Sequence, residues 1–302
     1  MKASIRWFAL SAFLVAAVAP CAAAAQSPPP QALPPGIRGG SEVVPEPGVQ
    51  IRHYAFTPTG EQLPYSVFVS SKVSRDRKAP LIIALRGFTG TTLTFVRGTA
   101  VDLAEQGGYI LVGAIGYNNR AGFGVVRGPR PGAAPPPGAP AAPPGAAPRP
   151  EPPFVGGRVE ADPLKVTQYS EQDVMNVLRS VREEFNIDER RIYLMGHSQG
   201  GGGARHLGEK YADIWAGVAM LAPALFDVQV TRESKIAKVP MMLAVGDKDF
   251  LIDSNREFRT QLASQGIALD YHEIPGLDHG TIIMGAMPQV YDFFARHVKP
   301  VR

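Results

Sequence analysis

An apolar strand that runs directly into a glycine-rich turn is the feature that most constrains the fold of this chain. Arg191–Met195 has the composition of a buried strand, and Gly196-His197-Ser198-Gln199-Gly200 follows it without a spacer. A glycine-rich helix is predicted immediately afterwards, near Gly201–Tyr211. A turn this sharp projects the Ser198 hydroxyl above the edge of a sheet and leaves no room for side chains at its two outer glycines. The helix N-terminus behind the turn would also stabilise negative charge beside that hydroxyl.

Short apolar runs alternate with helical patterns along most of the chain, which predicts an α/β fold with a mostly parallel central sheet and helices on both faces. The predicted strands are Val49–Phe56, Tyr65–Ser70, Pro80–Leu85, Tyr109–Ile115, Arg191–Met195, Ala216–Leu221, Val239–Val245 and Leu269–Ile274. The predicted helices are Leu93–Glu105, Ser170–Phe185, Gly201–Tyr211, Ser254–Gln265 and Met287–His297. Ser170 is the predicted cap of its helix, because Asp173 occupies the capping-box position behind it.

Most of the 29 prolines lie in two segments that the predicted fold does not need. Seven fall in Gln26–Gly48 and twelve in Gly128–Pro153. Neither segment has hydrophobic periodicity, so neither can bury enough apolar surface to offset the entropy of ordering. We expect Gln26–Gly48 to be a disordered tail. We expect Gly128–Pro153 to be a surface insert within a single domain that spans residues 49–302, although it could instead link two domains.

Residues 1–25 are predicted to be a secretory signal peptide. Lys2 and Arg6 precede the apolar stretch Trp7–Ala19, which is shorter than the roughly 20 residues that cross a bilayer. Small residues at Ala23 and Ala25 form a cleavage pattern. An uncleaved membrane anchor is one alternative, and a lipoprotein attached at the single cysteine of the leader is another. We therefore expect a secreted or periplasmic protein without stable membrane insertion after cleavage.

Composition excludes several other classes of protein. The only cysteine, Cys21, lies in the leader, which excludes a disulfide scaffold and a cysteine-based zinc site. No other cluster has metal-ligand spacing, so neither a metal nor a cofactor is expected. The net charge is only +4 and there is no dense basic run, which argues against nucleic-acid binding. The sequence carries no signal for an oligomeric state.

A serine nucleophile needs a histidine base and a carboxylate that orients it. The predicted base is His279, because it lies in a glycine-flanked loop after the last strand. The other histidines lie within or beside predicted regular elements and are expected to be structural or solvated: His53, His197, His206, His272 and His297. His197 is expected to point away from Ser198. The predicted acid is Asp249, with Asp247 as the alternative. Asp253 could instead cap the following helix.

Two backbone amides are candidates for an oxyanion hole, the group of donors that stabilises the negative oxygen of a tetrahedral intermediate. One is the N–H of Gln199, directly after the serine. The other is the N–H of Phe88, in the loop after the strand Pro80–Leu85, where Gly87 lets the chain turn toward the serine.

Together these residues resemble the α/β-hydrolase superfamily, and within it the secreted branch that includes feruloyl esterases, polyhydroxybutyrate depolymerases and the catalytic domain of prolyl oligopeptidase. The resemblance covers Tyr54–Val298 without the insert and is most specific in Tyr169–Val174 and Asn186–Ser198. The family usually has His-Gly in the oxyanion loop, and its histidine braces that loop. Here Arg86 stands in its place, so it is expected either to brace the loop or to face an anionic group of the substrate.

The resemblance implies a secreted serine hydrolase that cleaves small-molecule or polymeric carboxylic esters through an acyl-enzyme. A serine peptidase or amidase of the prolyl-oligopeptidase type is the first alternative. Such enzymes usually carry a large gating domain, and the residues before Ile51 are too few to form one. A non-catalytic binding protein with the same fold is the other alternative.

Overall fold

The computed structural model describes residues 45–126, 153–225 and 228–301. The predicted signal peptide, residues 26–44 of the predicted tail and residues 128–152 of the predicted insert lie outside these ranges.

The described residues form one eight-stranded sheet with the order β1-β2-β4-β3-β5-β6-β7-β8. The strands are β1 (Val49–Phe56), β2 (Glu61–Val69), β3 (Ala79–Leu85), β4 (Ile110–Ala114), β5 (Ile187–His197), β6 (Gly217–Leu221), β7 (Met241–Gly246) and β8 (Asp270–Ile274). The first two strands pair antiparallel, β2 pairs antiparallel with β4, and all later pairings are parallel. The predicted mostly parallel sheet is therefore confirmed.

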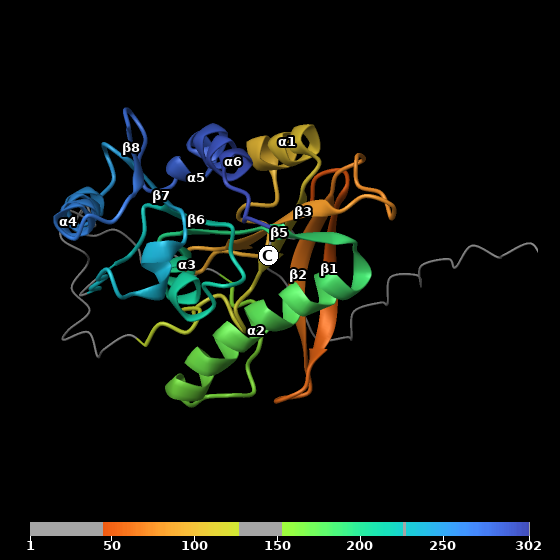
Figure 1. The fold of residues 1–302 in the computed structure, drawn as a ribbon. Coiled ribbons are helices and arrows are strands. Elements are labelled where there is room, and N and C mark those ends of the chain that lie inside the picture. The colour runs from red at the N-terminus through yellow and green to blue at the C-terminus, as the bar shows by residue number, and fades with distance from the viewer. Residues whose placement is uncertain (1–44, 127–152, 226–227, 302) are drawn as a thin grey trace, which may run out of the picture. The chain divides into compact units, whose positions relative to one another are not determined.

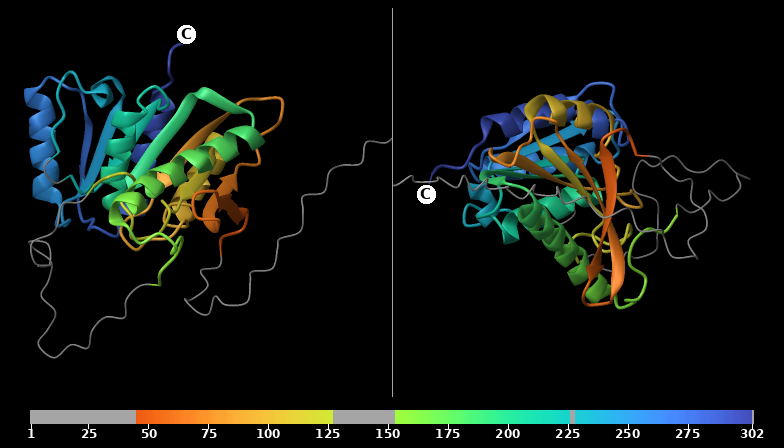
Figure 2. Two further views of the ribbon diagram at one scale, coloured as in Figure 1. Left: turned by 90° about the horizontal axis from the view of Figure 1, so that it is seen from below. Right: turned by 90° about the vertical axis from the view of Figure 1, so that its right-hand side faces the viewer.

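Helices cover both faces of this sheet, as predicted. They are α1 (Gly98–Gly107), α2 (Pro163–Glu184), α3 (Gln199–Lys210), the 3₁₀ helix η1 (Lys235–Lys238), α4 (Ile252–Ser264), α5 (Ile282–Gly285) and α6 (Met287–Arg296). Helices α1 and α6 lie on one face, and α2 and α3 lie on the other (Figure 1). The Tyr291 hydroxyl of α6 donates to the Ala100 carbonyl of α1 over 2.7 Å, which ties the first pair together. The long α2 runs obliquely across its face (Figure 2).

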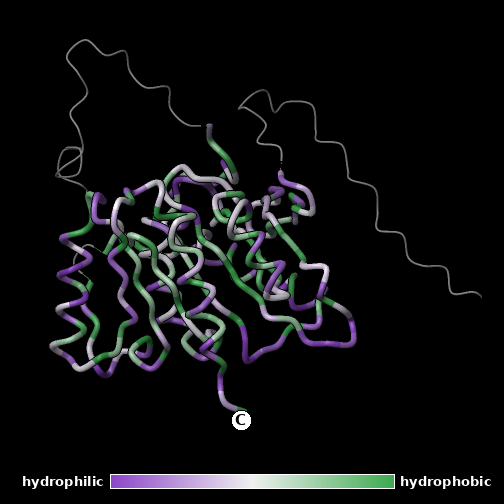
Figure 3. Tube along the Cα trace, turned by 90° about the horizontal axis from the view of Figure 1, so that it is seen from above, coloured by the Kyte–Doolittle hydropathy of each residue, from purple (hydrophilic) through white to green (hydrophobic). Residues whose placement is uncertain are grey.

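The core consists of the central strands and the helix faces that pack on them. Every residue of β3, β4, β6 and β7 is buried, as continuous apolar runs in a sheet covered on both faces must be. Hydrophilic segments lie mainly toward the periphery, at turns and on the outer sides of helices (Figure 3). Within the described residues, no helix is both long and apolar enough to cross a membrane.

The start of α2 differs from the prediction. The helix begins at Pro163, and Asp162 caps it by accepting a 2.9 Å hydrogen bond from the Leu164 amide. Ser170 is a buried residue inside the helix, where its hydroxyl donates to the Thr167 carbonyl. The prediction of Ser170 as the cap was wrong, because an aspartate followed by proline at the first helical position is an equally valid start signal.

Other boundaries also move, among them the start of β5, which begins at Ile187 instead of Arg191. Helix α1 begins at Gly98 instead of Leu93, because Leu93 and Phe95 pack into the core from an irregular turn. Strand β2 begins at Glu61, so the hairpin with β1 is tighter than predicted.

Candidate active site

Ser198 lies at the sharp turn between β5 and α3 in a strained conformation. Its φ of 52° and ψ of −114° fall outside the regions that non-glycine residues usually occupy. The Ser198 amide donates to the Leu221 carbonyl at 2.9 Å, and its carbonyl accepts from the Ala224 amide at 2.9 Å. Neighbouring β6 and the loop after it therefore hold the strained residue in place.

The two outer glycines of this turn are required by close backbone approach. A Cβ on Gly196 would overlap the Gly200 carbonyl, and a Cβ on Gly200 would overlap the carbonyls of Leu85 and Arg86 at the end of β3. The turn is therefore packed against the loop that follows β3, as the sequence predicted for an elbow.

His279 and Asp249 complete a chain of hydrogen bonds to Ser198. The Nε2 atom of His279 lies 2.9 Å from Ser198 Oγ, and its Nδ1 atom lies 3.0 and 2.9 Å from the two oxygens of Asp249. A carboxylate only accepts, so Nδ1 carries the hydrogen and the lone pair of Nε2 faces the hydroxyl. Ser198 therefore donates to His279, the arrangement that a general base needs before it removes the proton.

Parallel topology explains how residues so distant in sequence meet. Strands β5, β7 and β8 end at the same edge of the sheet, so Ser198, Asp249 and His279 emerge side by side. The Asp249 side chain is fully buried and also accepts a 2.8 Å bond from the Leu251 amide, which fixes its orientation.

The alternative acids lie elsewhere. Asp247 accepts a 2.7 Å bond from the Gly276 amide and braces the turn after β8. Asp253 lies in the first turn of α4 and pairs with Arg256 at 3.4 Å, but Leu251 is the N-cap residue, so the predicted capping role of Asp253 was wrong. Of these three carboxylates, Asp249 is the one that contacts His279.

The loop after β3 passes directly beside Ser198. A Cβ added to Gly87 would lie 2.8 Å from His197 Nδ1 and 3.6 Å from Ser198 Cβ. Gln199 opens α3, so its amide has no acceptor within the helix. The placement of both segments is compatible with the Phe88 and Gln199 amides as oxyanion donors, which stays a prediction.

Arg86 is buried, with 1% of its surface exposed. Its guanidinium donates to the carbonyls of Ile115 (3.0 Å), Gly87 (3.0 Å) and Ala121 (2.9 Å). Of the two roles expected for this residue, loop bracing agrees with these contacts. A side chain with almost no exposed surface cannot face a substrate.

Known proteins resemble this chain in fold but hardly in sequence. No protein-family model and no curated protein matches the sequence. An S-formylglutathione hydrolase from Agrobacterium tumefaciens is 14% identical, with a TM-score of 0.60 over 83% of this chain and 95% of that chain. A ferulic acid esterase from Anaeromyces mucronatus is 16% identical, with a TM-score of 0.54 over 86% of this chain and 94% of that chain. A putative dipeptidyl aminopeptidase IV from Bacteroides ovatus is 14% identical, with a TM-score of 0.56, but the match covers 82% of this chain and only 36% of that chain.

The chain has the α/β-hydrolase fold. In this α/β-hydrolase fold the hydrogen-bonded Ser198, His279 and Asp249 stand at the carboxyl edge of the sheet, where the fold places reactive side chains.

His197 has a role that the sequence did not reveal. Its ring centroid lies 4.6 Å from that of His279, and its Nε2 atom lies 2.7 Å from the His279 carbonyl oxygen. Burial, followed by the proximity of His279, lowers the pKa of His197 to about 4. The ring is therefore neutral at pH 7, and its Nε2–H donates to that carbonyl, which ties the loop of the candidate base to the elbow.

Phe250 is a second residue beside the site that the sequence did not indicate. Its ring centroid lies 4.3 Å from that of His279, and 41% of the residue remains exposed. His197 and Phe250 each lie next to a predicted site residue in the sequence, but both contact His279, which is distant from them along the chain. Only the position next to Ser198 or Asp249 could have drawn attention to them.

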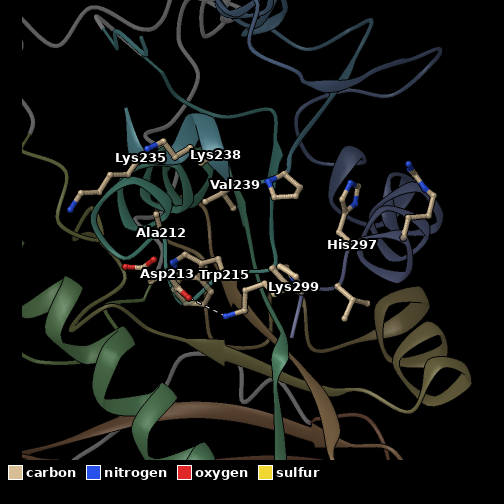
Figure 4. A pocket seen from close by; sticks show the side chains of 13 residues that line it. Ala212, Asp213, Trp215, Lys235, Lys238, Val239, His297 and Lys299 are labelled. Carbon is tan, nitrogen blue, oxygen red and sulfur yellow. Dashed lines mark hydrogen bonds between the residues drawn. The ribbon is translucent and has the colours of Figure 1, made fainter. Parts of the chain in front are cut away.

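A separate cavity of about 550 Å³ lies at the opposite edge of the sheet, beside the amino ends of β6 and β7 (Figure 4). Trp215, Val239 and His297 line it, and Lys299 closes one side by donating to the carbonyls of Asp213 and Ile214. None of the candidate site residues lines this cavity. Over the same described ranges, no group of three or more His, Cys, Asp or Glu side chains is arranged to hold a metal ion.

Proposed function

We propose that this protein is a serine hydrolase that cleaves carboxylic esters through an acyl-enzyme. The observation that carries the proposal is the hydrogen-bond chain from Ser198 through His279 to Asp249, with both links at 2.9 Å, on a strained elbow of the α/β-hydrolase fold. A serine hydroxyl is a weak nucleophile, and this chain supplies the base that activates it.

The proposed reaction has two halves. Ser198 Oγ attacks the ester carbonyl while its proton moves to His279 Nε2, and the resulting imidazolium is stabilised by Asp249. Collapse of the tetrahedral intermediate releases the alcohol, which takes the proton from His279. A water molecule then attacks the acyl-enzyme by the same route, giving the carboxylic acid and free Ser198 Oγ–H.

The negative oxygen of each tetrahedral intermediate needs donors that are already in place. We assign this role to the amides of Phe88 and Gln199, because the loop after β3 and the start of α3 flank the serine. Each such donor typically lowers the barrier by about 3 kcal/mol.

An ester fits the observations better than a peptide. The described residues form one α/β-hydrolase unit that spans nearly the whole length of the esterase and S-formylglutathione hydrolase neighbours, but about a third of the aminopeptidase neighbour. The partly exposed ring of Phe250 against His279 favours a substrate with apolar or aromatic groups.

The proposal is tested by replacing Ser198 with alanine. The wild-type protein is expected to hydrolyse short-chain p-nitrophenyl esters and to be labelled at Ser198 by a fluorophosphonate. The S198A variant should fold, measured by circular dichroism, but lose both properties. Unchanged hydrolysis in S198A would refute the proposal. Faster cleavage of chromogenic peptides than of every ester tried would favour a peptidase.

We also propose that the protein is exported, since residues 1–25 have the pattern of a cleaved leader. Mass spectrometry of the protein from its native host should find an N-terminus at Gln26. An intact Met1, or a lipid on Cys21, would contradict this cleavage.

A further inference from the structure

The buried guanidinium of Arg86 contacts the peptide that carries the first proposed oxyanion donor and the side chain of the residue that carries the second. It donates to the Gly87 carbonyl, which belongs to the same peptide as the Phe88 N–H, and to the Gln199 side chain. We infer that Arg86 is a positioning residue for the oxyanion hole: it sets the direction of the Phe88 N–H and holds Gln199 at the start of α3. This inference rests on the proposed function.

The first step concerns the peptide between Gly87 and Phe88. The described residues contain no cis peptide bonds, and in a planar trans peptide the C=O and N–H point in opposite directions. The Gly87 carbonyl is held by two donors, Arg86 Nη1 at 3.0 Å and the Gly90 amide at 3.1 Å. The Phe88 N–H must therefore point away from the buried guanidinium. Since Gly87 lies directly against Ser198, that direction leaves the N–H available at the site.

The second step concerns Gln199. Its Oε1 atom lies 3.4 Å from the same Nη1 atom of Arg86, and its Nε2 donates to the Arg120 carbonyl at 3.2 Å. The residue is buried, with 4% exposed. One guanidinium nitrogen thus contacts the peptide of the first proposed donor and the side chain of the second, and so links the two segments that carry these amides.

The third step concerns the hydrogen bonds that hold Arg86 itself in place. Its Nε donates to the Ile115 carbonyl, and its Nη2 donates to the carbonyls of Asn118 and Ala121. The amide on the far side of the Ile115–Gly116 peptide donates to buried Asp173 at 2.7 Å. This peptide therefore lies between a cation and a carboxyl group, which fixes its plane from both sides.

The charge of Arg86 adds a polar effect to the geometric one. A guanidinium stays protonated in proteins and makes stronger hydrogen bonds than a neutral donor. A carbonyl that accepts from a cation polarises its peptide, which makes the N–H of the same peptide a better donor. We expect the Phe88 N–H to gain strength in this way at the moment when the oxyanion forms.

The test compares Arg86→Met with wild type. Methionine retains an unbranched apolar stem but has no N–H groups. With active sites titrated by a fluorophosphonate, R86M should lower kcat about 100-fold, the effect of losing one oxyanion donor, while KM changes little. The affinity for an alkylboronic acid, whose serine adduct is tetrahedral, should fall by a similar factor. A kcat per active site near that of wild type would overturn the inference.

Tyr54→Phe is the matched control for loss of stability. Tyr54 donates to Asp173 at 2.6 Å, at the far end of the same buried network, where Asp173 and the Ile115–Gly116 peptide lie between it and the guanidinium of Arg86. Y54F should therefore be destabilised but retain the wild-type kcat and boronic acid affinity. If Y54F loses kcat as R86M does, the effect is general loosening and the inference is wrong.

Arg86→Lys is the second test variant, to be used if R86M fails to fold. Lysine retains the charge but lacks the planar fork, so it cannot hold the carbonyls of Gly87, Asn118 and Ala121 together. We expect kcat to fall about 10-fold in R86K, again without a matching change in KM. Full activity of R86K would overturn the inference.

A crystal structure of the variant separates this inference from the proposed function. Rotation of the Gly87–Phe88 peptide, with the Phe88 N–H displaced from Ser198, supports a positioning role whether or not any ester is turned over. An unchanged peptide would overturn that role. Failure of the wild-type protein to hydrolyse esters or to react with a fluorophosphonate would instead refute the proposed function.

Discussion

At the scale of single residues, the candidate site depends on one strained backbone and one buried carboxylate. Ser198 keeps a positive φ because β6 and the following loop bind its amide and carbonyl. Asp249 is fully buried, so its charge faces His279 without competition from water. Asp247, two residues earlier, instead accepts a hydrogen bond from the Gly276 amide in the turn after β8. The sequence made Asp249 the preferred acid and left Asp247 as the alternative, and the structure shows that the two aspartates have different partners.

Replacing each aspartate by asparagine separates their roles. Asp249→Asn places an amide against His279 Nδ1, which favours the wrong tautomer and should lower kcat about 10⁴-fold. Asp247→Asn should leave kcat close to wild type, because it changes only a turn. Steady-state hydrolysis of a p-nitrophenyl ester measures both. Equal losses in the two variants, or a larger loss in D247N, would contradict the assignment of Asp249.

His197 makes stability depend on pH with a defined sign. Its pKa in the folded protein is lowered to about 4 from 6.5, so between these values the unfolded chain binds a proton that the native chain does not. The native state therefore loses stability as pH falls through this window, by up to about 3 kcal/mol. Asp173 acts in the opposite direction, because burial raises its pKa to about 6 from 3.8.

His197→Gln isolates this contribution, because Asp173 is present in both proteins and cancels in the difference. Urea unfolding should show that the stability advantage of wild type over H197Q shrinks by about 3 kcal/mol between pH 7.5 and pH 4. A difference that stays constant over this range would show that His197 does not titrate as described.

At the scale of elements, the site is assembled by strand ends. Parallel strands β3, β5 and β7 bring the proposed oxyanion loop, the turn that carries Ser198 and the candidate acid Asp249 to one edge of the sheet, and the loop after β8 places His279 at the same edge. Helix α2 contributes none of the three candidate residues Ser198, His279 and Asp249. Its Asp173 accepts a hydrogen bond from the Gly116 amide, in the same peptide as the Ile115 carbonyl that Arg86 binds. The position of α2 therefore matters to the site, and its start is set by Asp162.

The cap of α2 can be tested directly. Asp162→Ala removes the 2.9 Å acceptor of the Leu164 amide and should lower the free energy of unfolding by about 1 kcal/mol. Asp162→Ser retains a capping oxygen and should change stability much less. Chemical denaturation measures both variants. If D162A is as stable as wild type, the helix does not depend on this cap.

At the scale of the whole molecule, the segment predicted to be an insert interrupts the described fold between residues 126 and 153. The chain after this gap is attached firmly: Asn119 donates its side-chain amide to the Pro153 carbonyl at 2.8 Å and pairs with Val155 through its backbone. The Gly157 amide then donates to the Tyr117 carbonyl at 2.7 Å. Residues 153–157 therefore belong to the fold, although Pro153 was predicted to be part of the insert.

Two deletions test this boundary. Replacing residues 128–152 with a short Gly-Ser linker should leave a folded protein with kcat within about threefold of wild type, because the segment is almost wholly Pro, Ala, Gly and Arg and has no hydrophobic periodicity. Deleting residues 153–157 instead removes the bonds to Tyr117 and Asn119, next to the carbonyls that Arg86 binds, and should lower both stability and kcat. Thermal unfolding and ester hydrolysis measure both. Unfolding of the first deletion protein would show that the insert is structural.

The sequence by itself determined the fold class, the nucleophile motif and a short set of candidates for each role. These depend on local signals: apolar runs of strand length, glycines where backbone must approach closely, and a loop histidine beyond an aspartate. It misplaced the start of α2 because two valid capping patterns lie within eight residues, and local propensity does not choose between them.

Only the tertiary structure decided which carboxylate meets His279, what Arg86 binds and where His197 points. Most of the contacts that decide these points join residues 29 to 113 positions apart, such as Arg86 with Ile115 and with Gln199. Such contacts follow from strand order and register, which pack distant segments together. No local pattern in the chain encodes them.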